Sequence, residues 1–372
     1  MTIRKKQEET DMKRFKSMKT ARKAIALLSA AALFAGCASS TGTASSASSS
    51  QESLSSLAKA QTGETYSVGL AQLVDHTSLN TIREAILDEF EQEGYKEGEN
   101  ITIDYQNAAG KTSSLDSIMS GYQNDQVDAI IAIATPTAMA AQNYSQTTPV
   151  IFSAVSYPVE SGLVESLEKP GGNITGTSNQ IQVEQIVDLM LKLSPQIKTV
   201  GMLYNPGESN SVSTTKRFKE YAQSKGLTVS EKTGTDSTTL QQAAVELASS
   251  VDAMFSPNDN TVATGMVSLG QVARDAGIPY YVSVDSMVAT GGFATIGIDY
   301  EELGRETAKM TIDVLNGKSP SEMPVKVFKD DLNVYINEDV LKELEANGKT
   351  KVELPEDIAG QDNLVTMHTA QE

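Results

Sequence analysis

The chain has few of the residues from which crosslinks, metal sites and acid–base catalysts are made: one cysteine and two histidines in 372 residues. The single cysteine, Cys37, allows no disulfide framework within the chain. His368 lies close to the C-terminus, so a histidine-based catalytic or metal scheme would depend on His76 alone. Nucleophile elbows, lysine-containing phosphate loops and HExxH motifs are also missing. We therefore predict a protein that is not an enzyme and uses no cofactor or metal, in which His76 is a ligand contact or a structural group.

Long apolar runs are scarce too, and the one near the N-terminus is short. Ala24–Phe34 is apolar except for Ser29, but its 11 residues fall well below the roughly 20 that a membrane-spanning helix needs. Nine Lys or Arg against three acids precede it, between Arg4 and Lys23. This order is typical of an export signal, and we predict residues 1–36 to be a signal peptide.

Cys37 directly follows the apolar run and the small pair Ala35–Gly36, and this order resembles a lipobox. Phe34 departs from that pattern, in which an aliphatic residue is usual. The alternative is an ordinary cleavage site followed by a free thiol. Lipidation of Cys37 would place the protein at the cell membrane, anchored by lipid on the extracytoplasmic face. The Ser-, Ala- and Thr-rich stretch Ala38–Ala60 cannot bury enough apolar area to fold, so we predict 37–65 as a lipidated flexible tether.

Positive charge is scarce in the rest of the chain. The precursor carries a formal charge of −18 and the leader +6, which leaves −24 after cleavage. Such a surface repels phosphate backbones and anionic lipid headgroups, so nucleic acid is excluded as a partner. A strongly acidic exported protein is otherwise simply well solvated.

From Tyr66 onward, short β-rich apolar runs alternate with segments of helical spacing. The predicted strands are Ser67–Leu73, Ile101–Gln106, Ala129–Ala134, Val150–Val155, Thr199–Tyr204, Thr228–Lys232, Ala253–Ser256, Pro279–Val284 and Phe293–Ile298. The predicted helices are Thr81–Glu93, Leu115–Asn124, Pro136–Tyr144, Val183–Leu193, Ser209–Lys225, Thr239–Ser250, Val262–Asp275 and Tyr300–Leu315. Alternation of this kind indicates an α/β fold with parallel sheets flanked by helices.

The alternation occurs twice, on either side of the Gly/Pro-rich stretch Glu168–Gly176, which we interpret as a polar crossover leading into a hinge. We therefore predict two Rossmann-like lobes joined by a multi-strand hinge. Their expected limits are 66–176 plus about 298–328 for lobe 1, 177–297 plus about 329–360 for lobe 2, and 361–372 for a tail. Parallel sheets bind ligands beyond the carboxyl ends of their strands, and two facing lobes form a cleft there.

Polar residues gather at the predicted strand ends. The candidate ligand-binding residues are Leu73, Asp75, His76, Thr135, Thr137, Ser153, Tyr157, Asn179, Asn205, Asn258, Asp259 and Asp285. Thr135, Asn258 and Asp259 are also good helix N-caps. The two interpretations are compatible, because a helix N-terminus offers N–H donors and a positive dipole end to an anion.

Several segments in order along the chain resemble one family, the substrate-binding lipoproteins of bacterial ABC importers that include the tryptophan- and tyrosine-binding proteins. The segments that carry the resemblance are Val74–His76, Ala134–Ala138, Ala154–Val159, Gly171–Ser178, Asn258–Val262 and Gly297–Gly304. The resemblance implies a type I periplasmic-binding-protein fold that closes on a small solute and presents it to an ABC permease. It also implies hinge segments near Thr177–Gln180, near Tyr281–Asp285 or Gly297–Tyr300, and near Phe328–Asp331.

Tyr157 stands where the family commonly has an aspartate that pairs with a ligand's ammonium. Asp259, Asp75 or Asp285 would then take the amino group, or the solute is not a standard α-amino acid, and the Tyr157 ring could stack on an aromatic or cationic ligand.

The leading hypothesis is a monomeric solute-binding lipoprotein that captures an amino acid, aromatic in particular. Thr135 and Thr137 would bind its carboxylate, Asp259 with Asn258 and Asn205 its amine, and Tyr157 its side chain. The alternatives are a tethered surface adhesin or ligand sensor of the same fold, and an exported hydrolase, which the scarcity of histidine disfavours.

Overall fold

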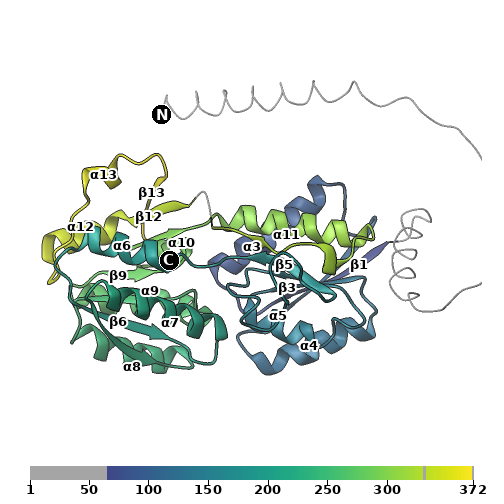
Figure 1. The fold of residues 1–372 in the computed structure, drawn as a ribbon, viewed down its shortest axis with the longest axis horizontal. Helices are drawn as coiled ribbons and strands as arrows, with labels where there is room; N and C mark the ends of the chain where they lie inside the picture. Colours follow the sequence, from purple (N-terminus) through teal and green to yellow (C-terminus); the bar gives the residue numbers. More distant parts are fainter. Residues whose placement is uncertain (1–64, 330–331, 371–372) are drawn as a thin grey trace, which may run out of the picture. The chain divides into compact units, whose positions relative to one another are not determined.

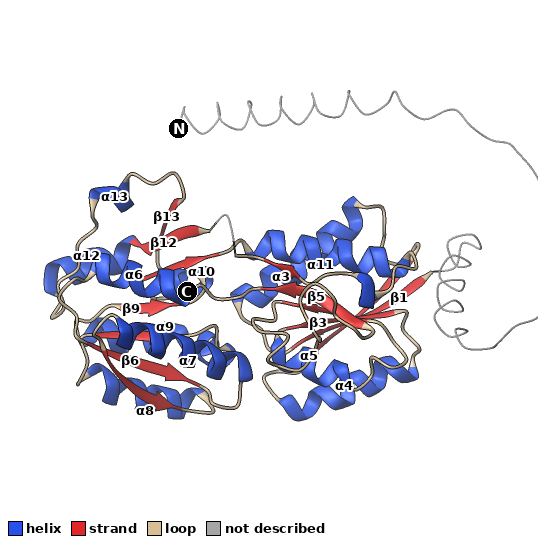
Figure 2. Ribbon diagram, viewed as in Figure 1, coloured by secondary structure: helices blue, strands red, loops and turns tan. Residues whose placement is uncertain are grey.

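The computed structural model describes residues 65–329 and 332–370. The predicted signal peptide, Cys37 and all but the last residue of the predicted tether lie outside the described residues. Two β-sheets, each covered by helices on both faces, form the described part of the chain (Figure 1). The fold-class prediction is confirmed: strands and helices alternate along the chain (Figure 2), and neighbouring strands are parallel with one exception.

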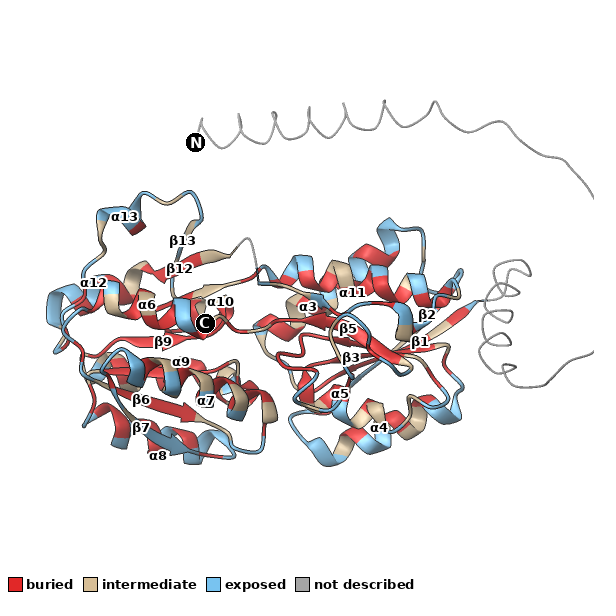
Figure 3. Cartoon of the chain, viewed as in Figure 1, coloured by how far each residue is buried: buried red, intermediate tan, exposed pale blue. Residues whose placement is uncertain are grey.

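Sheet 1 has the strand order β11-β5-β4-β3-β1-β2, and its pairs are parallel. Its strands are β1 (Tyr66–Gln72), β2 (Ile101–Asn107), β3 (Ala129–Ile133), β4 (Val150–Ser153), β5 (Ile174–Ser178) and β11 (Lys326–Val327). All five residues of β3 are buried, because this central strand is covered on both faces. Ile131 packs in the cluster that holds α3 and α11, whereas Ile130 packs in the cluster of α4 and α5. The buried strands stand out between exposed helix surfaces in Figure 3.

Helices α3 (Thr77–Gln92) and α11 (Tyr300–Leu315) cover one face of sheet 1, and α4 (Thr112–Asn124) and α5 (Thr135–Gln142) the other. The pair α3 and α11 packs closely because Gly304 lacks a side chain: a Cβ there would lie 2.6 Å from the carbonyl oxygen of Ile82. In this way a helix from late in the sequence completes lobe 1.

Sheet 2 has the order β13-β12-β10-β9-β8-β6-β7. Its strands are β6 (Thr199–Tyr204), β7 (Thr228–Thr233), β8 (Ala253–Ser256), β9 (Tyr280–Val282), β10 (Ala294–Gly297), β12 (Asn333–Asn337) and β13 (Leu364–Met367). The β10–β12 pair is the antiparallel exception.

The helices of lobe 2 are divided between the two faces of sheet 2. They are α6 (Val183–Leu193), α7 (Ser209–Ser224), α8 (Ser237–Ala248), α9 (Asn260–Asp275), α10 (Asp285–Ala289), α12 (Glu338–Asn347) and α13 (Glu356–Ala359). In α6 the apolar residues Val183, Ile186, Val187 and Met190 repeat at helical spacing and are buried. A capping box of Asp236 and Thr239 starts α8.

Two expectations about the chain's organisation need correction. Glu168–Gly176 is not only a crossover, because Ile174–Ser178 forms β5 within sheet 1. Gly176 (φ +155°) lets β5 approach β4, since a Cβ there would lie 1.9 Å from the carbonyl oxygen of Phe152. The stretch 361–372 is not only a tail, because Leu364–Met367 forms β13 and pairs with β12. The described chain passes between the sheets after β5, after β10 and after β11.

No helix within 65–329 or 332–370 is both long enough and apolar enough to span a bilayer.

Candidate functional site

A cavity of about 380 Å³, counting the space at its mouth, lies where the carboxyl ends of strands from both sheets meet. The polar residues that line it are His76, Ser78, Thr135, Asn179, Asn210, Asn258, Asp259, Asn260 and Tyr300. The apolar ones are Leu79, Ala134, Ala154, Ala263, Val284 and Met287. The described residues that line it include no lysine or arginine.

The strand order explains the place of the cavity. In sheet 1, β1 and β3 are neighbours, yet the chain leaves β1 into α3 on one face and leaves β3 into α5 on the other. A crevice opens at such a reversal, beyond the carboxyl ends of the strands. His76 follows β1 and Thr135 follows β3. Sheet 2 repeats the arrangement at β6 and β8, and Asp259 follows β8.

The N-terminus of α5 faces the cavity with spare donors. No side chain caps this helix, and Pro136 lies in its first turn. The first N–H groups of a helix have no partner within it and lie at the positive end of its dipole. Ala134 (φ 80°) and Ala154 (φ 58°), at the ends of β3 and β4, both have left-handed backbone and both line the cavity. Such strain is held where the surrounding structure enforces it, often at binding sites.

The N-terminus of α9, across the cavity, is already occupied by carboxylates. Asp259 caps it by accepting a hydrogen bond from the Val262 N–H at 2.9 Å. Glu208 accepts from the N–H groups of Asn260 and Thr261, both at 3.2 Å. The two helix N-termini therefore differ in sign: α5 offers donors, and α9 presents negative charge.

Asp259 and Glu208 form a buried acidic pair. Besides the α9 cap, Asp259 Oδ2 accepts from the Asn205 N–H and from the Ser211 hydroxyl, both at 2.7 Å. Burial and then the neighbouring charge of Glu208 raise the pKa of Asp259 to about 8. Burial likewise raises the pKa of Glu208. A cation placed beside Asp259 would therefore be strongly favoured, because it would offset both effects.

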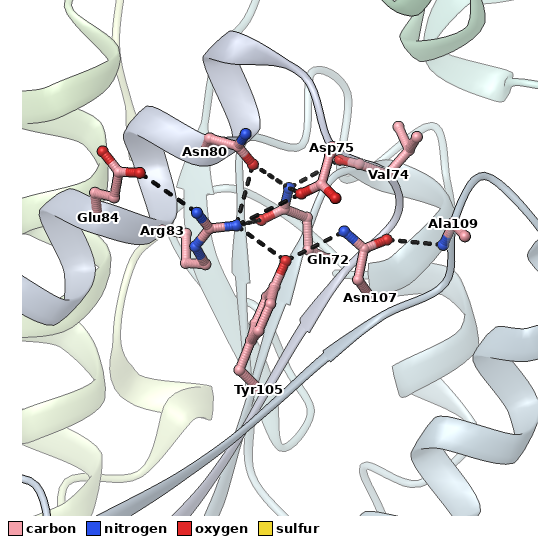
Figure 4. A network of polar contacts seen from close by, with 9 residues as sticks. All are labelled: Gln72, Val74, Asp75, Asn80, Arg83, Glu84, Tyr105, Asn107 and Ala109. Carbon is pink, nitrogen blue, oxygen red and sulfur yellow. Dashed lines mark hydrogen bonds and ion pairs between the residues drawn. The ribbon is translucent and has the colours of Figure 1, made fainter.

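A network of polar contacts lies at the end of β1, directly before His76 in the chain, and Figure 4 shows the residues that form it. Gln72 is fully buried and donates to the carbonyl oxygen of Val74 at 2.8 Å and to Asn80 Oδ1 at 2.7 Å. Arg83 donates to Gln72 Oε1 at 3.3 Å and lies 4.9 Å from the ring centroid of Tyr105. These contacts fix the loop that ends at His76.

The His76 ring has one satisfied nitrogen and one buried nitrogen without a partner. Nε2 lies 3.1 Å from Asn260 Oδ1, and Nδ1 is buried with no hydrogen-bond partner. Burial lowers the pKa of His76 below its ordinary value, so the ring is neutral at pH 7. A second buried acceptor, Asn210 Oδ1, also lacks a partner on the cavity wall.

A chain of hydrogen bonds joins the lobes beside the cavity. Asn258 Nδ2 donates to Ser156 Oγ at 2.6 Å, Ser156 Oγ donates to Asn179 Oδ1 at 3.1 Å, and Asn179 Nδ2 donates to the Tyr300 hydroxyl at 3.0 Å. This chain runs from the end of β8, across lobe 1, to the start of α11.

Tyr157, which we predicted to contact the solute, is not among the residues that line the cavity. The Arg217 guanidinium from α7 lies 4.6 Å from its ring centroid. Arg217 also pairs with Glu160, and Thr214 Oγ1 donates to the Tyr157 hydroxyl at 3.4 Å. The cation over this ring thus comes from the other lobe of the protein rather than from a ligand.

Of the predicted site residues, the structure brings five together on the cavity wall: His76, Thr135, Asn179, Asn258 and Asp259. Seven others lie outside the lining: Leu73, Asp75, Thr137, Ser153, Tyr157, Asn205 and Asp285. Asp75 is exposed and lies 3.7 Å from Arg83, and Ser153 bonds to Thr307 on α11 at 2.8 Å. Leu73 is part of the hydrophobic core. Thr137 is fully buried, and its Oγ1 has no partner.

Asn205 and Asp285 are not among the lining residues, although both lie next to them in the chain or through a hydrogen bond. The Asn205 side chain donates to Thr261 Oγ1 at 2.9 Å, and Asp285 begins α10, where burial raises its pKa to about 6. Among the lining residues that we did not predict, Asn210 is the polar one with an unpartnered atom. Its position in the first turn of α7, after the turn at Asn205, was the available signal.

Among the described residues, no group of three or more His, Cys, Asp or Glu side chains is arranged to hold a metal ion.

Comparison with known proteins defines the class. The family model described as ABC transporter substrate binding protein matches residues 67–358, and the chain belongs to this family. The resemblance drawn from the sequence is confirmed. The family is one of solute-binding proteins rather than of enzymes.

Individual relatives are similar over most of the chain. A tyrosine-binding protein of Clostridioides difficile (strain R20291) is 38% identical over 287 residues, which are 77% of this chain and 83% of that protein. A domain from Streptococcus pneumonia, solved in complex with L-Trp, is 33% identical and covers 82% of this chain and 100% of its own, with a TM-score of 0.77. The ligand-free, open structure of a substrate binding protein with adhesive properties from Clostridium difficile is 38% identical over the same shares, with a TM-score of 0.63.

The L-Trp complex has the higher TM-score of the two structures but the lower sequence identity. The chain resembles the L-Trp complex more closely in structure, although the open structure is the closer of the two in sequence. Within this chain, hydrogen bonds join the two lobes, from Asn258 to Ser156 and between His76 and Asn260. More distant binding proteins, such as one with bound myo-inositol at 16% identity and a TM-score of 0.53, share the fold alone.

Proposed function

We propose that the protein binds an α-amino acid across its cavity, with the carboxylate at the N-terminus of α5 and the ammonium beside Asp259. The observation that carries this proposal is the opposite electrostatic character of the two helix N-termini. The α5 terminus has no side-chain cap, so its N–H groups can bind an anion. The α9 terminus is filled by Asp259 and Glu208, which favour a cation.

The side chain of the solute is aromatic in this proposal. Leu79, Ala263, Val284 and Met287 line the cavity together with the polar groups that would bind the amino and carboxyl groups. The tyrosine and L-Trp named for two relatives supply the chemical class. Burial of an aromatic ring contributes the largest apolar term to such binding.

Titration of the purified protein with amino acids tests the proposal. The chain contains no tryptophan, so bound L-Trp can be followed by its own fluorescence. We expect L-Trp or L-Tyr to bind, and tryptamine and N-acetyl-tryptophan, which lack the carboxylate and the ammonium respectively, to bind at least tenfold more weakly.

Asp259→Asn should weaken the binding of L-Trp. Asp75→Asn, at an exposed acid outside the cavity, should leave the binding of L-Trp unchanged. Equal binding of L-Trp and N-acetyl-tryptophan would refute the placement of the ammonium.

We also propose a cellular setting, for which the sequence around Cys37 is the support. Lipidation of Cys37 would hold a monomeric binding protein on the extracytoplasmic face of the membrane, where it delivers the solute to an ABC permease for import. A tether raises the concentration of the protein near its membrane partner without any new contact. Loss of L-Trp uptake in cells that lack the gene, restored by the wild-type protein, would support import.

A second candidate function is adhesion, because a relative of 38% identity is described as having adhesive properties. Adhesion that persists in the Asp259→Asn variant would be independent of solute binding, and adhesion lost with it would indicate a surface formed by the closed state.

A further inference from the structure

The unpartnered nitrogen of His76 favours a particular kind of ligand group. The hydrogen bonds made by Asn260, the neighbour of His76 in the cavity, show which kind. Glu208 accepts on both oxygens: Oε2 from the Asn260 N–H at 3.2 Å, and Oε1 from the Thr261 N–H at 3.2 Å and the Thr261 hydroxyl at 3.1 Å. The Asn260 side-chain atom that faces Glu208 Oε2 must therefore be the NH₂ group. Asn260 Oδ1 is left to face His76.

This orientation fixes the tautomer of His76. Asn260 Oδ1 can only accept, so His76 Nε2 must carry the hydrogen that it donates over 3.1 Å. In a neutral ring, Nδ1 then has a bare lone pair and can only accept. That nitrogen is buried and has no partner. A buried acceptor without a donor is costly, and a donor on the ligand would remove the cost.

The surroundings of His76 indicate which part of the ligand supplies the donor. His76 precedes α3, and Ser78 of α3 bonds to Ser286 of α10. Leu79, Ala263 and Met287, from α3, α9 and α10, line the same cavity as His76. In the proposed function these apolar residues contact the side chain of the ligand. The ammonium has its own acceptors in lobe 2, Asp259 and the unpartnered Asn210 Oδ1.

We propose that His76 Nδ1 accepts a hydrogen bond from the ring N–H or O–H of the ligand, and so selects tryptophan and tyrosine over phenylalanine. The inference rests on the proposed function and adds the basis of its specificity. A site built around a substrate N–H or O–H rejects the analogue that lacks this donor, because its own polar group is then left unpaired.

The experiment compares L-Trp, L-Tyr, L-Phe and 1-methyl-L-tryptophan on the wild type and on His76→Leu. For the wild type, we expect L-Phe and 1-methyl-L-tryptophan to bind about tenfold or more weakly than the better of L-Trp and L-Tyr. His76→Leu should weaken the binding of L-Trp and L-Tyr by a similar factor. The binding of L-Phe should be unchanged or tighter. His368→Leu changes the other histidine, which is exposed and outside the cavity, and should leave all four affinities unchanged.

Each outcome decides the question. If His76→Leu weakens L-Phe as much as L-Trp, the nitrogen binds the ammonium and the proposal is wrong. If the wild type binds L-Phe as tightly as L-Trp and L-Tyr, the N–H or O–H of the ligand ring makes no contribution to binding and the proposal is wrong. If none of the amino acids binds the wild type, the proposed function itself fails. L-Phe binding that is retained by His76→Leu shows that this variant is folded.

Discussion

Raising the pH from about 6.5 to about 8 should destabilise the ligand-free protein and at the same time strengthen its binding of an amino acid. Both effects arise from Asp259, whose pKa burial and Glu208 raise to about 8. In that window the Asp259 carboxyl holds a proton in the folded protein, whereas in the unfolded chain it has already lost its proton. The stability that comes from this protonation is therefore lost as the pH rises. For one proton the free energy of unfolding falls by about 1.4 kcal/mol per pH unit.

The affinity changes in the opposite direction, because the ammonium of the ligand pairs with the ionised form of Asp259. If only this form binds, the dissociation constant falls by up to about tenfold per pH unit as the pH approaches 8. Thermal unfolding without ligand and L-Trp fluorescence titration, both from pH 6.5 to 8, measure the two slopes.

Asp259→Asn should flatten both slopes. Asp75→Asn, at an exposed acid outside the cavity, is the control, and both slopes should persist. The titration of His76 falls below the window, since burial lowers its pKa. A stability that rises from pH 6.5 to 8, or an affinity that does not change, would show that Asp259 is ionised throughout and that the reasoning is wrong.

Three further predictions concern other parts of the chain. Arg217→Ala removes the cation from the Tyr157 ring, and we expect the affinity for L-Trp to fall about three- to tenfold in titrations. An unchanged affinity would show that this contact between the lobes contributes nothing to binding. Gly304→Ala should lower the melting temperature because its Cβ meets α3 at 2.6 Å, whereas Gly121→Ala, in α4 with open space around it, should raise it slightly. Cys37→Ala should release the protein from cells into the medium, and retention in the membrane fraction would contradict lipid anchoring.

Strands with continuous apolar sequence could be predicted from the chain alone, and those defined by their partners could not. Ala129–Ile133 is apolar at every position and lies where it was expected. Strand β5 contains one large apolar residue and a glycine, and it is a strand because β4 and β11 pair with it. Strand β13 is half exposed at a sheet edge and depends on pairing with β12 about 30 residues earlier. Local periodicity does not carry such long-range pairing.

Some residues of the site could likewise be predicted from the sequence, and others could not. Residues directly after a strand, such as His76 and Asp259, reach the cavity because the strand end itself lies there. Ser153 is the last residue of β4 and points toward α11 instead, since successive side chains of a strand alternate between faces. Asn210 could not be identified from strand ends, because a turn of helix brings it to the cavity.

Tyr157 contacts a cation that the sequence order did not indicate. Arg217, 60 residues later, lies over its ring. A contact that joins the two lobes lowers the free energy of the closed arrangement whether or not a solute is present. A solute shifts the equilibrium between open and closed only by its difference in affinity for the two. Each contact of this kind therefore reduces the part of the binding free energy that closure consumes, and so raises affinity at a distance from the solute. In the proposed function the selectivity of the cavity depends on residues that touch the solute, and we propose His76 and Asp259 as the two that matter most, because one has an unpartnered buried nitrogen and the other a raised pKa.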